Sequence, residues 1–106
     1  MNYQPLLTQL GITPNYVCFY QLSFALEFVR QYPDTLLLIT KLLYPAVAKE
    51  FNTSWKTVER NIRSAVGMAW RNNPELVCRL AGRPLTDKPK AAQFIAILAN
   101  LEQSDV

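Results

Sequence analysis

The chain has 106 residues, of which half are hydrophobic and 18% are charged. This length and composition fit a globular domain with its own core and exclude an intrinsically disordered chain. Histidine is absent, which removes the commonest general base and the commonest metal ligand. Cys18 and Cys78 stand in no metal-like spacing, so we expect two buried thiols in a reducing cytosol, with a disulfide as the less favoured alternative.

The net charge of +3 comes from one part of the chain. Residues 1–31 and residues 72–106 each carry equal numbers of basic and acidic side chains, whereas residues 32–71 carry six basic and three acidic ones. A local basic surface attracts a phosphate backbone. The longest apolar run, at residues 36–39, is too short to span a membrane, and no signal peptide is indicated. We therefore expect a cytoplasmic protein without a membrane partner.

The first two predicted helices precede a Tyr-Pro break. Residues 4–10 form a short amphipathic helix that Gly11 ends as a C-cap. Thr13 and Pro14 are predicted to be the cap and the first position of a helix that continues over residues 15–31. That helix is apolar almost all round, which indicates a central core helix or, alternatively, an additional contact surface.

The next segments lead to the predicted helix over residues 55–71. Asp34 is predicted to cap a short apolar helix over residues 35–43, and Pro45 separates that helix from the one that follows. Asn52 can adopt the left-handed conformation that a tight turn requires. Ser54 can then cap another helix by accepting a backbone N–H. This succession of helix, turn and capped helix predicts a helix-turn-helix over about residues 45–71.

The helix over residues 55–71 has two different faces. Apolar residues at three- and four-residue spacing form one buried stripe. At about 100° per residue, a polar row lies opposite that stripe. The row consists of Lys56, Arg60, Arg63, Ser64, Gly67 and Arg71, with Thr57 and Glu59 on its flanks. It is either a solvated basic face or a surface that binds nucleic acid.

The width of the major groove, about 12 Å, means that mainly the N-terminal part of this helix can reach base edges. Arginine can pair with guanine in two hydrogen bonds, glutamate can accept one from cytosine, and lysine can hold phosphate or guanine. The residues in this part of the helix are of these types.

The C-terminal third contains two more predicted helices. Asn73 and Pro74 stop the preceding helix, and a short helix follows over residues 75–81. Residues 82–90 form an irregular loop that either touches phosphate through its basic residues or is an ordinary solvated loop. The last helix covers residues 91–101, and residues 102–106 are expected to form a frayed tail.

The last helix carries Phe94, Ile95 and Leu98 at helical spacing. These side chains are predicted to pack in the core or, alternatively, to form a dimer contact. No segment alternates at period two over a useful length, so no sheet is expected. The predicted fold is all-α, with about six helices in one domain over residues 1–106.

Two motifs resemble the C-terminal effector domain of the stage-zero sporulation protein A response regulators. They are Leu-Tyr-Pro-Ala-Val-Ala-Lys at residues 43–49 and Val-Glu-Arg-Asn-Ile-Arg-Ser-Ala at residues 58–65. The resemblance extends over nearly the whole chain, from about residue 6 to residue 101. It implies a helix-turn-helix transcription regulator of spore-forming bacteria that reads a short promoter element, often as a pair of tandem domains.

The resemblance also implies roles for individual residues. Thr57, Glu59 and Arg60 match family residues that contact bases, while Lys56 and Arg63 match neighbours near the DNA backbone. To the second group we add Ser54 and Arg71, which lie at the ends of the same helix.

The sequence departs from the family at three points. The family commonly has Arg where this chain has Thr57, and Lys56 replaces a small polar residue beside it. The family also favours Lys-Gly where this chain has Val17-Cys18. The receiver domain of the regulators is not present in these 106 residues, which indicates either an excised effector domain or a free-standing paralogue.

Two functions follow as hypotheses. The first is a sequence-specific DNA-binding domain of a sporulation-type transcription regulator. Its partner is double-stranded promoter DNA, on which it forms a homodimer or a tandem pair, with the C-terminal helix as the candidate pairing surface. The second is a protein-interaction module that pairs with a related regulator and has lost specific DNA reading. It rests on Thr57 and on an apolar group in residues 15–31, namely Val17, Cys18, Phe24 and Phe28.

An enzyme is not expected. The sequence has no histidine, no glycine-rich phosphate loop, no nucleophile elbow and no pair of carboxylates that we can place in a cleft. We therefore expect no catalytic residue, no metal, no cofactor and no small-molecule substrate.

Overall fold

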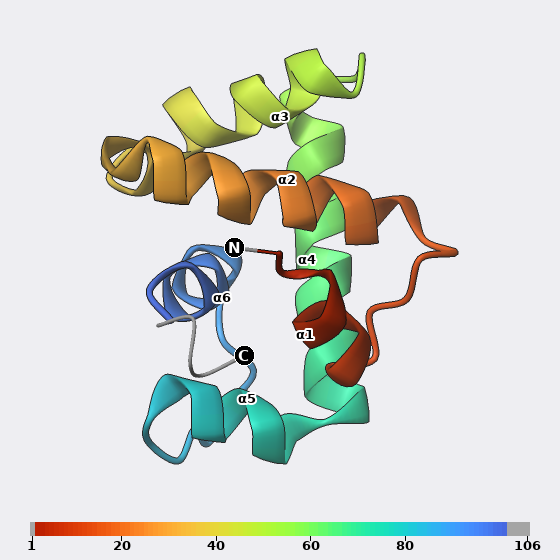
Figure 1. Ribbon diagram of the computed structural model, residues 1–106, viewed down its shortest axis with the longest axis vertical. Helices are drawn as coiled ribbons and strands as arrows, with labels where there is room; N and C mark the ends of the chain where they lie inside the picture. Colours follow the sequence, from red (N-terminus) through yellow and green to blue (C-terminus); the bar gives the residue numbers. More distant parts are fainter. Residues whose placement is uncertain (1, 102–106) are drawn as a thin grey trace.

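The longest element of the computed structural model, which describes residues 2–101, is the helix α4, Trp55–Asn72. At 1.5 Å per residue it is about 27 Å long, close to the 33 Å longest dimension of the protein. Figure 1 shows α4 extending along the molecule, with α2 (Val17–Gln31) crossing over it. α3 (Tyr44–Glu50) lies at the N-terminal end of α4, and α5 (Pro74–Ala81) follows its C-terminal end.

The remaining helices pack against α2. α1 (Gln4–Gln9) and α6 (Ala91–Ala99) both contact it, and α6 also contacts α4. No strand occurs between residues 2 and 101. The predicted all-α fold is therefore confirmed, and α3, the turn at residues 51–54 and α4 are consistent with the predicted helix-turn-helix. The predicted tail at residues 102–106 lies outside the described residues.

One hydrophobic core joins the helices. The α4 stripe contributes Val58 and Ile62, both fully buried, as the helical spacing predicts. From α6, Phe94, Ile95 and Leu98 are at most 1% exposed and belong to the same core. Core packing, the first of the two expectations for these three side chains, is therefore confirmed, and their burial leaves them no exposed surface for the alternative dimer contact.

A polar pair, of which Gln21 is buried and Asn61 half-buried, joins the two long helices. The side-chain amide of Asn61 on α4 donates to Gln21 Oε1 on α2 at 2.9 Å, and Gln21 is only 2% exposed. A buried amide without a partner is costly. This hydrogen bond therefore favours one register of α2 on α4, in addition to the apolar contacts around it.

Glycines follow the ends of two helices, and Gly11 does so as predicted. Gly11 after α1 and Gly82 after α5 have φ of 86° and 76°, a region that favours glycine. At Gly11 an added Cβ would lie 2.5 Å from the Asn72 side chain, whose amide donates to the Gly11 carbonyl at 3.3 Å. The end of α1 is thereby attached to the end of α4.

The segment between α2 and α3 is not the single helix predicted over residues 35–43. It contains a 3₁₀ turn at Pro33–Leu36 and a π turn at Ile39–Leu43 that continues directly into α3. Pro45 therefore does not separate two helices. Proline lacks an N–H, and its ring displaces the carbonyl four residues earlier. The helix therefore widens just before Pro45. In this wider turn the Tyr44 N–H donates to the Ile39 carbonyl, five residues earlier.

The predicted cap of that segment is also wrong. The N-cap residue of the 3₁₀ turn is Tyr32, not Asp34, and the turn is closed by Thr35, whose hydroxyl donates to the Tyr32 carbonyl at 2.7 Å. Asp34 lies inside the turn rather than before it, so its carboxylate is not placed to receive the first backbone N–H groups.

The start of α2 is later than predicted. Residues 13–16 form a turn in which the Tyr16 N–H donates to the Thr13 carbonyl at 3.1 Å, and Pro14 occupies this turn. The Thr13 hydroxyl donates to the Asn15 side chain instead of capping a helix. Tyr16 is extended, with φ of −113° and ψ of 138°, so α2 starts at Val17.

The two cysteines differ in environment. Cys18 is buried, as expected, and burial raises the pKa of its thiol. Cys78 is only half-buried, contrary to the expectation, because α5 lies at the edge of the core, where the Cys78 sulfur accepts from the Leu85 N–H at 3.4 Å. Both thiols are free.

Replacement of Asn61 should show how much its hydrogen bond to Gln21 contributes to stability. Asn61→Ala leaves the side-chain oxygen of Gln21, Oε1, buried without its donor. We therefore expect a loss of about 1–3 kcal/mol in the free energy of unfolding. Urea denaturation measures this loss. The double variant Gln21→Met with Asn61→Leu is the control and should cost less, because it removes both polar groups. An Asn61→Ala protein with the wild-type unfolding midpoint would contradict this account.

Two buried tyrosines should make the fold sensitive to alkali. Burial raises the pKa of Tyr3 and Tyr44 above the ordinary value of 10.0, with Arg30 partly opposing the effect at Tyr3. The neutral phenol therefore stabilises the folded state below pH 10. That stability is lost as the pH rises from about 10 through the pKa of the folded state. The loss is about 1.4 kcal/mol for each unit by which the tyrosine pKa in the folded state exceeds that in the unfolded state.

Urea unfolding at pH 9 and at pH 10.5 measures this loss. The fall in the unfolding free energy should be smaller in Tyr44→Phe, which has no phenol to ionise at this position. The half-exposed Tyr20 supplies the control, since Tyr20→Phe should leave the fall unchanged. Equal falls in Tyr44→Phe and the wild type would show that Tyr44 is not responsible.

Candidate nucleic-acid interface

The turn at residues 51–54 sets the direction of α4 relative to α3. Asn52 has φ of 53°, the left-handed conformation predicted for it. The Thr53 N–H donates to the Ala48 carbonyl at 2.9 Å and the Asn52 N–H to the Lys49 carbonyl at 3.4 Å, which is the Schellman arrangement of a helix C-terminus. The chain thus leaves α3 by a defined route.

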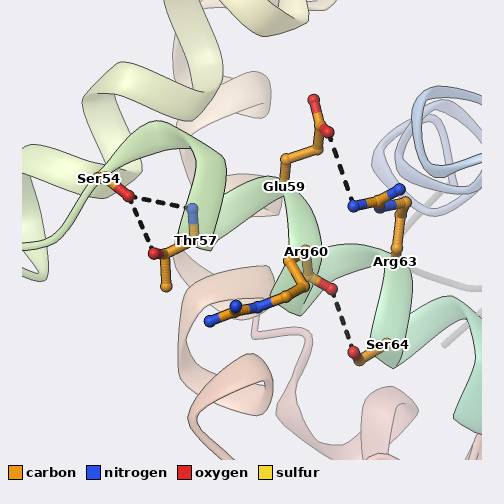
Figure 2. Close-up of polar contacts among 6 residues, drawn as sticks. All are labelled: Ser54, Thr57, Glu59, Arg60, Arg63 and Ser64. Atoms are coloured by element: carbon orange, nitrogen blue, oxygen red, sulfur yellow. Dashed lines mark hydrogen bonds and ion pairs between the residues drawn. The ribbon is translucent and has the colours of Figure 1, made fainter.

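Ser54 begins α4 as predicted. Its backbone is extended, and its Oγ accepts from the Thr57 N–H at 3.2 Å. The same Oγ lies 2.9 Å from the Thr57 hydroxyl (Figure 2). The Thr57 side chain is therefore held beside the cap at the first turn of α4, where a groove-binding helix presents its readers.

The outward row of α4 is accessible to solvent. Lys56, Arg60, Arg63, Ser64 and Arg71 are exposed, as is Ser54 at the cap. The flanking Thr57 and Glu59 are half-buried. The structure therefore brings all the predicted site residues together on one helix and its cap, in the order that the helical spacing predicts.

Glu59 and Arg63 form a loose ion pair. Glu59 Oε1 and Arg63 Nη2 are 3.8 Å apart, and the two side chains are 35% and 64% exposed, respectively. Pairs of this kind on a helix surface contribute about 0.3–0.5 kcal/mol. Arg63 could therefore leave Glu59 for a phosphate group with little loss of free energy from the broken ion pair.

Glu59 and Arg60 leave α4 in different directions (Figure 2). Glu59 borders a hollow of about 400 Å³ that is also lined by Tyr44 and the start of α6. Its negative charge adds to the effect of burial in raising the pKa of Tyr44, which places the carboxylate near that phenol. Arg60 extends on the side of Thr57 instead. Among the predicted base readers, Glu59 is thus the one on the flank facing α3.

Lys56 lies beside an exposed aromatic ring. Its Nζ is 5.8 Å from the ring centroid of Trp55, which is 39% exposed. A cation at this distance is attracted to the face of an indole. The first turn of α4 therefore presents an ammonium group and a large flat ring side by side.

A second hollow of about 520 Å³ extends along the outer face of α4. It is lined by Arg60, Arg63, Ser64, Gly67, Met68 and Arg71 of α4, and by Lys88 of the loop at residues 82–90. Four of these side chains are cationic, and the lining includes no carboxylate among the described residues. We refer to this set of residues as the cationic hollow. A surface of this kind holds anions rather than cations or apolar ligands.

Lys88 was not among the site residues that the helical pattern identified. The sequence is compatible with either a solvated or a phosphate-binding loop at residues 82–90, because spacing along a helix does not show where a distant loop lies. The structure places Lys88, like Arg63, in the lining of both hollows. The neighbouring Lys90 borders only the smaller of these two hollows.

The described residues include no helix with both the length and the apolarity that a membrane crossing requires.

The comparison with protein families agrees with the geometry of α3 and α4. Residues 4–101 match the family model described as "Sporulation initiation factor Spo0A C terminal". The match covers all of the helices described above. This family is one of regulatory DNA-binding domains in sporulation and transcription control, not of enzymes. The chain belongs to the family of Spo0A C-terminal domains, the effector domains of sporulation initiation factors.

Proposed function

We propose that this protein is a sequence-specific DNA-binding domain of a bacterial transcription regulator, with α4 in the major groove of promoter DNA. The observation that carries the proposal is the exposed cationic row of α4, held outward by a capped turn and a fully buried apolar stripe. DNA-binding families place the second helix of such a pair in the groove. Family membership supports the same conclusion.

The proposed contacts divide by position along α4. Thr57, Glu59 and Arg60 lie in the first turns and contact base edges. The side chains of Ser54, Lys56, Arg63 and Arg71 contact phosphates on either side of the groove. The Arg60 guanidinium suits the two acceptors of guanine, and the Glu59 carboxylate suits the amino group of cytosine.

Thr57 changes what the domain reads. A threonine is shorter than the arginine that the family commonly has here, and its hydroxyl already lies against Ser54. We infer that its base contact is weaker and that Lys56, one residue earlier, supplies a cation in its place. The preferred DNA sequence is then related to the family element but distinct from it.

The proposal includes tandem pairing of domains on DNA and action in the cytoplasm, where a bacterial regulator meets its promoters. The pairing surface is not the apolar set of α6, because Phe94, Ile95 and Leu98 are buried. We further propose that residues 1–106 act as one domain, since the core draws side chains from every α-helix between residues 4 and 99.

A protein-interaction module is the second candidate. The exposed side chains of Tyr16, Val17 and Tyr20 at the start of α2 favour it. Most of the apolar group that first suggested it is used internally, however. Cys18 is buried, and Phe24 stacks on Phe28 with ring centroids 5.8 Å apart. Co-purification discriminates between the two functions: a stable protein partner without DNA retention would favour this one.

Selection of bound sequences from a random duplex pool tests the main proposal directly. We expect the wild-type protein to enrich a short common element. The same protein should prefer that element to random duplex in a gel-shift assay at moderate salt. Equal binding of the element and random duplex would overturn sequence-specific reading.

Arg60→Ala should weaken binding to the selected element by about 1–3 kcal/mol and relax the preference at one base position, because it removes a bidentate base contact. Fluorescence anisotropy with the element and with single-base variants measures both effects. Arg79→Ala, which removes an exposed arginine from α5, is the control and should bind as the wild type. Unchanged base preference in Arg60→Ala would contradict the role of Arg60.

Arg63→Ala should weaken binding to all duplexes alike, because Arg63 is proposed to contact phosphate. The slope of log Kd against log salt concentration should fall by about one unit. Titrations at four salt concentrations with the element and with random duplex measure the slope. A loss confined to the selected element would instead make Arg63 a base reader.

A further inference from the structure

Gly67 is a glycine that the fold itself does not explain. It lies in the interior of α4, where glycine is among the poorest helix formers. A Cβ built at this position would meet nothing within 4 Å, so no neighbouring side chain or backbone requires its absence. Unlike Gly11 and Gly82, it does not have positive φ. An alanine would therefore fit the folded chain and favour the helix.

The surroundings of Gly67 are cationic. Arg63 and Arg71 stand one turn before and one turn after it, on the same face of α4. Lys88 approaches from the loop at residues 82–90, so three cations surround a stretch of helix backbone without a side chain. All four residues line the cationic hollow, which has room for a phosphate group and its neighbours in a strand.

The position of Gly67 along α4 fits the edge of the groove. It follows Arg60 by seven residues, about 10 Å along the helix axis. The major groove is about 12 Å wide. When Arg60 reaches base edges, Gly67 therefore lies near a groove edge, where the helix passes the sugar-phosphate strand.

We propose that the DNA backbone contacts α4 directly at Gly67, with its phosphates held by Arg63, Arg71 and Lys88. The absent side chain lets the strand approach the helix backbone closely, which is a known use of glycine. Lys88 makes the loop at residues 82–90 a second DNA-binding element. This inference rests on the proposed function and adds to it the contact that holds the duplex against the C-terminal half of α4.

The variant Gly67→Ala separates binding from folding. We expect its thermal unfolding midpoint to rise, because alanine is the better helix former. We expect its Kd to rise about tenfold for the selected element and for random duplex alike, because the methyl group holds the strand away from the helix. Anisotropy titrations and thermal unfolding measure the two effects. A higher midpoint with unchanged Kd, or a lower midpoint, would overturn the inference.

The variant Lys88→Ala tests the loop. Loss of one phosphate contact should reduce the salt slope by about 0.9. Arg79→Ala removes the same charge outside the cationic hollow and should leave the slope unchanged. Equal slopes in the two variants would overturn the role of Lys88 and, with it, the proposed contact of the DNA backbone with α4 at Gly67.

The outcomes distinguish this inference from the proposed function. If the wild type prefers its selected element but neither variant changes binding, the inference alone fails. If the wild type binds all duplexes equally and both variants weaken binding as stated, sequence-specific reading fails and the inference stands. If the wild type binds no duplex, both fail.

Discussion

The outer face of α4 is available to another molecule because its inner face is fixed in the core. Val58 and Ile62 are fully buried against the other helices, and Asn61 is tied to the buried Gln21. These contacts leave α4 little freedom to rotate about its axis. Packing on the opposite side of α4 therefore holds Arg60 and Arg63 toward solvent. The loose ion pair of Arg63 with Glu59 would cost little free energy to break.

The turn before α4 adds a second constraint, on direction rather than rotation. The left-handed Asn52 ends α3, and the Ser54 cap begins α4 within the same short segment. The capping hydrogen bond also engages Thr57, so side-chain contacts fix the first turn where base reading is proposed. Thr57 therefore contributes to the stability of the turn, and in the proposed function the same residue also influences the choice of DNA sequence.

The charges of α4 are arranged in two zones. In the first turns, cations stand beside Thr57 and Glu59, whose polar groups can discriminate bases. The cationic hollow begins at Arg60 and continues further along α4, and it contains no carboxylate in its described lining. The first zone suits the reading of base edges, and the second suits attachment to a uniform phosphate strand, which is the division of labour that DNA-binding proteins generally show.

The sequence alone determined the features that depend on near neighbours in the chain. The end of α3 at Asn52, the cap at Ser54 and the two faces of α4 were all predicted correctly, because each follows from a side chain acting on backbone within a few residues. The family followed from motifs in the same region.

Only the tertiary structure decided features that depend on distant contacts. It placed Phe94 and Leu98 of α6 in the core, since their helical spacing is the same for core packing and for a dimer contact. It also brought Lys88 to α4 and matched Asn61 with Gln21, because the path of a loop and the partner of a buried amide are set by packing and not by periodicity.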